Sequence, residues 1–247
     1  MKFWGKFLIL KTKITVCNYQ WIVKEIINNL NKKIVVAPVA SHPLTLAYLK
    51  KDYQKVLDQI DYVLPDSQWI RWSLDWFYKI KIPDRIYGPD LFLKLCQEVE
   101  KENIKISLIG NNLEKLKQKL KNLFPNLKIS PLIELENKVV DEELTKKINK
   151  RIKDLKKTII FIGIGSPKQH QLALKLKVNS PIVCIGAAFD FISGVKKQAP
   201  KWMGDWGLEW LFRLVNEPKI WRRYLIYGSL FLIFVIKQKF LKNEKPN

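Results

Sequence analysis

Short apolar runs alternate along the chain with longer segments whose apolar residues recur at helical spacing. The short runs are rich in Ile and Val, which predicts buried β-strands. These runs cover residues 33–39, 61–64, 104–110, 158–165 and 181–186. The segments with helical spacing lie near 43–60, 67–79, 90–102, 112–123, 141–156 and 167–177. Such alternation predicts an α/β fold in which helices flank both faces of a mainly parallel sheet.

The pattern changes beyond residue 200. Residues 201–247 contain no clear strand run but are rich in Trp, Arg and aliphatic residues, which predicts helices. We therefore expect one α/β domain over 1–200 and a helical C-terminal appendage over 201–247. The apolar run 224–236 would form a helix of roughly 20 Å, shorter than the ~30 Å hydrocarbon core, so we expect no membrane span there.

The charge of the chain suits a polyanionic partner. Its 247 residues include 44 Lys and Arg against 23 Asp and Glu, a net charge of +21. Nucleic acid, an anionic membrane surface and a phosphate-bearing substrate all remain compatible with this charge. Lysine occurs in nearly every segment, however, so much of the excess is typical of solvated helix surfaces.

Cysteine and histidine are too few and too scattered for a metal site. The 3 Cys and 2 His residues show no metal-ligand spacing, and the odd number of cysteines argues against a disulfide framework. We expect no structural metal and a reducing, cytoplasmic environment. The apolar stretch 7–10 near the N-terminus is too short for a signal peptide, which agrees with that location.

Ligands of parallel α/β sheets bind at the loops that follow the carboxyl ends of the strands. The loop 163–169, in the stretch "IGIGSPKQHQL", contains Gly163, Gly165, Ser166 and Gln169. Ser166 and Gln169 have capping-box spacing, with Pro at the first helical position. The loop is therefore either an anion site at a helix N-terminus or an ordinary capped turn.

Three further residues follow strands or flank such loops. Asp66, after the run 61–64, is either a general base or the cap of the helix that follows Ser67. Arg85 either grips a phosphate or forms a surface ion pair. Asp190 lies between two phenylalanines and is interpreted as structural unless it contacts substrate.

Several blocks together resemble the WecG/TagA/CpsF glycosyltransferases, glycosyltransferase family 26. The blocks "FIGIGSPKQ", "FDFISG", "APKW" and "GLEWLFRLVNEP", followed by "RRY", occur in the order and at the spacing of that family. The preceding "VLPDS", "RIYGPD" and "ISLIGNN" resemble its earlier blocks. The similarity covers residues from about 30 to 224.

The resemblance implies a Rossmann-like enzyme that inverts the anomeric centre without a metal or other cofactor. It would transfer a sugar of the N-acetylmannosamine, uronic acid or hexose type from a UDP-sugar to a polyprenyl-diphosphate-linked saccharide in polysaccharide or teichoic acid assembly. Asp66 matches the family's catalytic base, and Arg213 and Arg223 match arginines thought to reach the diphosphate. The expected substrate-binding residues are Ser41, His42, Arg85, Gly110, Gly163, Gly165, Ser166, Gln169, Asp190, Arg213 and Arg223.

The sequence departs from the family pattern at several positions. They are Ala40, Ser41 and His42 in place of Thr-x-Asn, Ser67 in place of Gly, His170 in place of an acid, and Gln198 in place of Arg. We interpret these departures as an altered sugar or acceptor preference. A catalytically inactive scaffold of the same fold is the alternative.

Basic and aromatic residues around the run 224–236 suit a helix that lies on an anionic membrane. They are Trp221, Arg222, Arg223, Tyr224, Lys237, Lys239 and Lys242. We therefore expect a peripheral enzyme on the cytoplasmic membrane face; packing on the domain or in a homo-oligomer is the alternative. A nucleic-acid partner is not expected, because no nucleic-acid-binding motif accompanies the charge.

Overall fold

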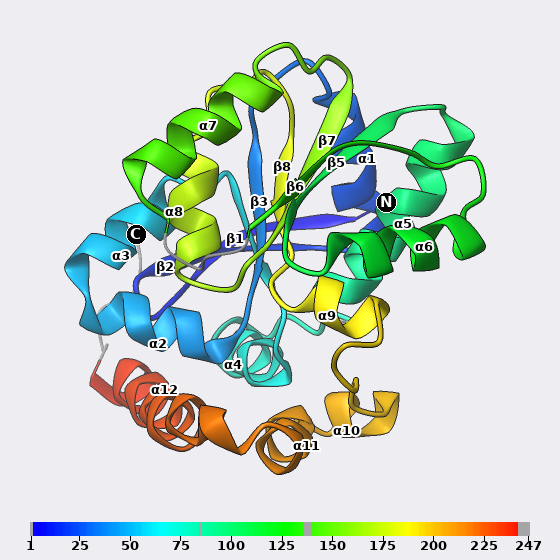
Figure 1. Cartoon of the computed structure of the whole chain (residues 1–247). Coiled ribbons are helices and arrows are strands. Elements are labelled where there is room, and N and C mark those ends of the chain that lie inside the picture. The colour runs from blue at the N-terminus through cyan, green and yellow to red at the C-terminus, as the bar shows by residue number, and fades with distance from the viewer. Residues whose placement is uncertain (1, 84, 136–139, 242–247) are drawn as a thin grey trace.

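A six-stranded, all-parallel sheet forms the centre of the protein (Figure 1). The computed structural model describes the chain except for residues 1, 84, 136–139 and 242–247. The strand order is β4-β3-β8-β7-β5-β6. The strands are β3 (Val35–Val39), β4 (Tyr62–Pro65), β5 (Lys105–Gly110), β6 (Lys128–Glu134), β7 (Thr158–Gly163) and β8 (Ile182–Cys184). The predicted α/β fold with a mainly parallel sheet is confirmed.

Helices cover both faces of the sheet, because successive residues of each central strand point to opposite sides. Ile160 and Ile162 of β7 pack into one core and Ile159 and Phe161 into the other. One face carries α2 (Ser41–Leu49), α3 (Lys51–Asp58), α7 (Glu142–Ile152) and α8 (Lys168–Lys175) (Figure 1). The other carries α1 (Tyr19–Asn28), α5 (Gly88–Lys101) and α6 (Leu113–Leu123). Burial on both faces explains why the central strands are continuous apolar runs.

All five predicted strand runs form strands, but several further elements were missed. They are the helices α1 and α9 (Ala188–Ile192), the edge strand β6, and an antiparallel hairpin of β1 (Phe3–Ile9) and β2 (Thr12–Cys17). In β6, buried and exposed positions are mixed, so the segment has no apolar run. The predicted helix 43–60 is in fact two helices, since Lys50 between α2 and α3 has an extended backbone.

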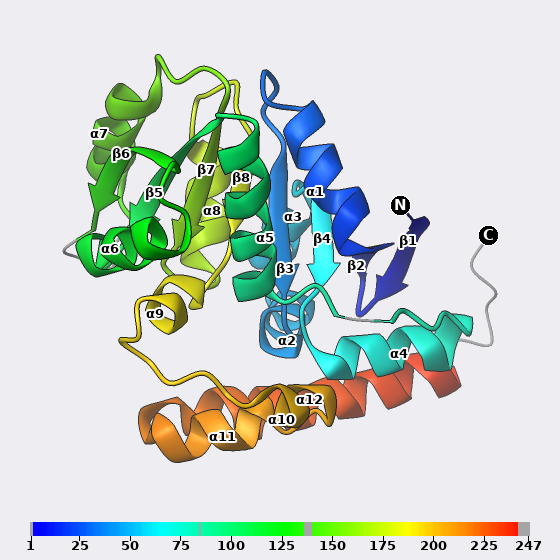
Figure 2. The same cartoon turned by 90° about the vertical axis from the view of Figure 1, so that its right-hand side faces the viewer.

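The carboxyl edge of the sheet is covered by the chain beyond residue 200. Helices α10 (Lys201–Asp205), α11 (Glu209–Asn216) and α12 (Trp221–Leu241), with the short 3₁₀ turn η1 (Pro218–Ile220), run along that end of the molecule (Figure 2). They are reached through α9 (Ala188–Ile192), while α4 (Gln68–Tyr78) lies beside them.

Helix α12 is attached to the domain along one side. Phe231 and Val235 are buried in the core that also contains residues of α2. The Gln238 side chain accepts a hydrogen bond from the Leu10 amide at 2.9 Å and donates one to the Leu8 carbonyl at 3.2 Å. Among the helices that the structure describes, none has the length and apolarity to cross a bilayer.

Candidate active site

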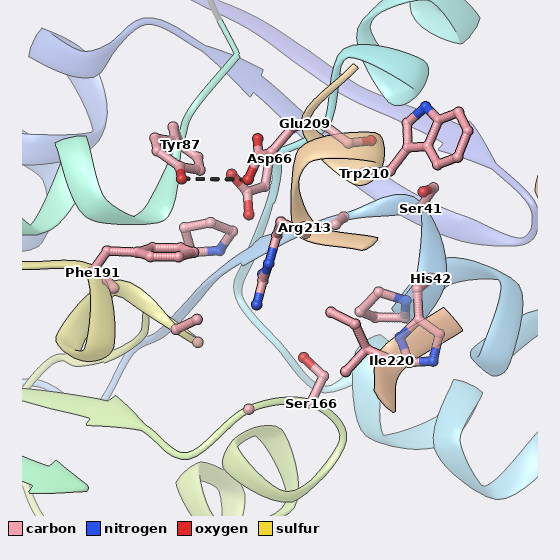
Figure 3. Close-up of a pocket in the computed structure, with 18 of the residues that line it drawn as sticks. Ser41, His42, Asp66, Tyr87, Ser166, Phe191, Glu209, Trp210, Arg213 and Ile220 are labelled. Carbon is pink, nitrogen blue, oxygen red and sulfur yellow. Dashed lines mark hydrogen bonds between the residues drawn. The ribbon is translucent and has the colours of Figure 1, made fainter. Parts of the chain in front are cut away.

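A cavity of about 630 Å³ lies between the carboxyl edge of the sheet and the C-terminal helices (Figure 3). Ten of the predicted site residues line it: Ser41, His42, Asp66, Arg85, Gly163, Gly165, Ser166, Gln169, Asp190 and Arg213. Gly110 ends β5 next to this edge and is not part of the lining. Arg223 belongs to α12, but its side chain lies outside the described residues. The cavity thus gathers loops that are far apart in the sequence.

Asp66 directly follows β4 and faces the N-terminus of α5. Its backbone amide donates to the Val39 carbonyl at 3.1 Å, which fixes the loop to β3. Its carboxylate accepts a hydrogen bond from the Gly88 amide at 3.3 Å. Helix α4 is capped instead by Ser67, whose hydroxyl accepts from the Ile70 amide at 3.4 Å. The alternative that Asp66 caps this helix is therefore wrong.

The surroundings of Asp66 make its carboxylate a stronger base than usual. Burial raises the pKa of Asp66 to about 7, against an opposing effect of the Arg85 charge and with a further increase from Glu209. A general base works best when its pKa lies close to the working pH. Asp66 therefore has the basicity that proton abstraction at neutral pH needs.

Arg85 is held in an ion pair between the domain and the appendage. Its Nη1 lies 2.6 Å from Oε2 of Glu209, and the two side chains are only 16% and 18% exposed. The same nitrogen donates to the Asp66 carbonyl at 3.3 Å, and the guanidinium stacks on the Tyr87 ring at 4.3 Å. Arg85 thus forms an ion pair, as one of the two alternatives held, but the pair is largely buried at the cavity and does not lie on a solvated surface. Phosphate binding by Arg85 stays a prediction.

The loop between β7 and α8 differs from the predicted capping box. Helix α8 starts at Lys168 after a cis Ser166–Pro167 peptide, and its N-cap makes no side-chain hydrogen bond. Gln169 instead turns its carboxamide to the loop that follows β8, where Oε1 accepts from the Gly186 amide at 3.0 Å. The capping-box prediction is therefore wrong, because a tertiary contact engages the glutamine. Gly165, with φ +81°, supplies the left-handed turn that glycine tolerates.

His170 lies behind the cavity wall and not in it. Its Nδ1 is 2.7 Å from the Tyr53 hydroxyl, and its Nε2 is 3.3 Å from Nε2 of Gln169. Full burial lowers the pKa of His170 to about 3, so the imidazole is neutral at physiological pH.

The other residues that depart from the family pattern lie in different surroundings. Ala40, His42 and Ser67 line the cavity, whereas Gln198 is exposed.

Gly163 and Gly110 make room for an aromatic ring of α9. A Cβ built on Gly110 would lie 2.8 Å from Phe189, and one built on Gly163 would overlap the same ring. The absence of side chains at these two strand ends lets α9 pack close to the sheet. Helix α9 also contains Asp190 and Phe191, which line the cavity.

A series of ion pairs joins α9 to α11. Nζ of Lys196 lies 3.0 Å from Asp190 and 3.1 Å from Glu217. Glu217 in turn accepts hydrogen bonds from Nε and Nη2 of Arg213 at 3.1 and 2.7 Å. Arg213 stacks on Phe191 at 5.1 Å and projects between Asp66 and Ser166 (Figure 3). The guanidinium of Arg213 thus faces the loop that contains Ser166.

Sequence reasoning missed Glu209 and Tyr87 as site residues. Both line the cavity, and the Tyr87 hydroxyl donates to Glu209 at 3.4 Å (Figure 3). The position of Glu209 inside the tryptophan-rich block 206–210 was the available signal in the sequence, but this position does not reveal that Glu209 pairs with Arg85.

Within the described residues, no three His, Cys, Asp or Glu side chains are arranged to hold a metal ion.

Comparison with known proteins identifies similar sequences over nearly the whole chain. The sequence model of the glycosyl transferase WecG/TagA/CpsF family matches residues 7–245. The N-acetylglucosaminyldiphosphoundecaprenol N-acetyl-beta-D-mannosaminyltransferase of Bacillus subtilis strain 168 is 27% identical over 226 residues, which cover 89% of this chain and 81% of that protein. The protein of the same name from Bacillus spizizenii is 28% identical over 180 residues, 70% of this chain and 67% of that protein.

Proposed function

Since the chain belongs to the WecG/TagA/CpsF family of glycosyltransferases, we propose that this enzyme transfers a sugar from a UDP-sugar to a saccharide carried on a polyprenyl diphosphate. The names of both similar Bacillus proteins describe N-acetylmannosaminyl transfer to N-acetylglucosaminyl diphosphoundecaprenol. An N-acetylmannosamine-type donor is thus the first to test, followed by uronic acid and hexose donors. The product would serve polysaccharide or teichoic acid assembly.

The observation that carries this proposal is the basic carboxylate of Asp66 in a cavity that is also lined by Arg213 and by the loop before α8. In the proposed reaction, Asp66 takes the proton from the acceptor hydroxyl as its oxygen bonds to the anomeric carbon. The bond from that carbon to UDP breaks on the opposite face, which inverts the configuration. One displacement needs one base, and Asp66 fills that role.

The charge on the departing diphosphate would be stabilised by groups already in place. Arg213 projects into the cavity, and the loop from Gly163 to Ser166 leads to the N-terminus of α8. The positive end of the helix dipole favours an anion there. Arg213, which is paired with Glu217 in this structure, would add its charge when the diphosphate takes the place of that carboxylate. We propose no metal or other cofactor for this step.

We also propose that the appendage, residues 201–247, completes the active site and rests on the cytoplasmic face of an anionic membrane. The appendage carries large apolar side chains that are more than half exposed. These are Trp202, Trp206, Val215, Ile233 and Phe240. Exposed apolar area combined with basic residues such as Arg222 and Lys237 favours binding at the headgroup region.

The test is a panel of UDP-sugars with a synthetic polyprenyl-diphosphate-N-acetylglucosamine acceptor. We expect turnover with one donor class and a loss of about 10² to 10⁴ in kcat for Asp66→Asn. The control is Asp58→Asn at the exposed end of α3, which should keep wild-type turnover. Equal turnover by Asp66→Asn would contradict the base assignment. No turnover of wild type with any donor would support the inactive scaffold instead.

A further inference from the structure

Arg85 occupies a position between two carboxylates that come from different parts of the chain. Asp66 follows β4 of the sheet, whereas Glu209 is the first residue of α11 in the appendage. Arg85 contacts Asp66 through the main-chain carbonyl at 3.3 Å, but it forms its ion pair with Glu209 at 2.6 Å. The cation next to the proposed base is therefore neutralised by the appendage and not by the domain.

Two other contacts limit the position of the Arg85 guanidinium. Tyr87 stacks on it, and the Tyr87 hydroxyl also donates to the same Glu209 carboxylate. Gly204 of α10 leaves room for the guanidinium on another of its sides, because a Cβ built on Gly204 would lie 2.7 Å from Nη2 of Arg85. Glu209 and Gly204 both belong to the appendage, so docking of the appendage determines where the guanidinium lies.

The ionisable groups that face Asp66 come from four elements. They are Arg85 and the Tyr87 phenol from the loop before α5, Asp90 from α5, Glu209 and Arg213 from α11, and the Tyr19 phenol from α1. Arg85 is the cation that lowers the pKa of Asp66, and Glu209 is the charge that opposes it most strongly. If Glu209 were neutral, the charge of Arg85 would act on the Asp66 carboxylate without its counter-ion. A nearby unopposed cation favours the ionised carboxylate and so weakens it as a base.

We propose that Glu209 is a positioning residue for the transfer: it holds Arg85 and neutralises its charge, so that docking of the appendage makes Asp66 a stronger base. The inference rests on the proposed function, in which Asp66 accepts the proton. It gives the appendage an electrostatic role in the chemistry, in addition to closing the cavity. Glu209 itself acts through Arg85 and need not touch the reacting atoms.

The test compares Glu209→Gln with Glu209→Asp in the full-length protein. Titration of the Asp66 carboxyl is followed by carbon-13 NMR with labelled aspartate, and Asp66→Asn identifies its signal. In Glu209→Gln we expect the midpoint to fall by about one pH unit, because the carboxylate then faces an unopposed cation. Glu209→Asp keeps the charge and should keep a midpoint close to that of wild type.

Glu143→Gln is the matched control, since Glu143 of α7 also forms an ion pair, with Lys147 at 2.7 Å, but does not line the cavity. It should leave the Asp66 midpoint unchanged. An unchanged midpoint in Glu209→Gln, or an equal fall in Glu143→Gln, would overturn the inference.

The pH dependence of kcat/KM separates this inference from the proposed function. If both hold, the acid limb of the Glu209→Gln profile moves down together with the NMR midpoint. If the midpoint falls but the acid limb stays in place, the coupling stands and Asp66 is not the base. If Glu209→Asp keeps the acid limb at its wild-type position, a merely structural effect of the Glu209→Gln substitution would be excluded.

Discussion

The hydroxyl of Tyr53 lies 2.7 Å from Nδ1 of His170 in the interior of the domain, where both side chains are buried. Gln169 fixes the tautomer of this histidine. Because Oε1 of Gln169 accepts from the Gly186 amide, its NH₂ group faces Nε2 of His170, which must then accept. The proton therefore sits on Nδ1 and is donated to Tyr53. The phenol and imidazole together orient the carboxamide that lines the cavity.

Removal of the Tyr53 hydroxyl tests this network. Tyr53→Phe leaves the Nδ1 proton of a fully buried imidazole without its acceptor, so we expect a loss of about 1 to 3 kcal/mol in the free energy of unfolding. Chemical denaturation followed by circular dichroism measures it. The Tyr78 hydroxyl donates to the Leu8 carbonyl at a half-buried site, so Tyr78→Phe should cost less. Equal losses would contradict the special role of Tyr53.

The same network shows where sequence reasoning stops. The loops after β4, β7 and β8 were predicted to meet because parallel strands place their carboxyl ends at one edge. That rule located Asp66, Gly163 and Gln169 at the cavity. The predicted orientation of Gln169 was wrong, however, because the capping-box pattern is local and the competing partner, Gly186, lies in the loop that follows β8.

Long-range contacts account for most of the remaining misses. Tyr87 and Glu209 are 122 residues apart, and no periodicity reveals that they meet. Strand β6 was missed for a different reason: it lies at the sheet edge, with partly exposed positions and Pro131 in its middle. Continuous apolar runs mark strands that are buried on both faces, so they identify the centre of the sheet better than its edge.

The raised pKa of Asp66 predicts that this carboxylate reduces stability. Its pKa is about 7 in the folded protein, against a usual value of 3.8, so the folded state binds more protons between these pH values. The free energy of unfolding therefore falls as pH rises through this window. Asp66→Asn removes this effect, so its advantage over wild type should grow from pH 4 to pH 7 and then stay constant.

Solvent limits the gain in stability of Asp66→Asn over wild type. Because Asp66 is partly exposed at the cavity, we expect its free energy of unfolding above pH 7 to exceed that of wild type by about 1 to 2 kcal/mol, less than the full shift in pKa would give. Urea denaturation of both proteins at pH 4, 5.5 and 8 measures it. An advantage that is the same at all three pH values would show that Asp66 titrates normally in the folded protein.

Close packing of α9 against the sheet depends on Gly163. A methyl group there overlaps the Phe189 ring, so Gly163→Ala should lower the free energy of unfolding by about 1 to 3 kcal/mol. Because α9 also contains Asp190 and Phe191, the displacement should alter the cavity. Gly228→Ala in α12 is the control: its Cβ meets no neighbour within 4 Å, and alanine favours the helix. Differential scanning calorimetry should show Gly163→Ala below wild type and Gly228→Ala at or above it; equal changes would contradict the packing argument.

Helix α12 has two apolar sides with different surroundings. Phe231 and Val235 are buried against the domain, whereas Ile233 is 56% and Phe240 70% exposed. If the exposed side binds a membrane, Ile233→Ser with Phe240→Ser should weaken binding to anionic vesicles by about tenfold or more, because each buried aliphatic or aromatic side chain contributes about 1.5 to 3 kcal/mol. Co-sedimentation with phosphatidylglycerol vesicles measures this.

Leu123→Ser is the control for this double variant, since Leu123 is 49% exposed and belongs to α6, a helix that lies away from the appendage (Figure 2). It should bind vesicles as wild type does. Contact between two copies of the chain is the competing use of the exposed side, and analytical ultracentrifugation distinguishes it. A double variant that loses an oligomer but keeps vesicle binding would assign this surface to a second subunit and not to the membrane.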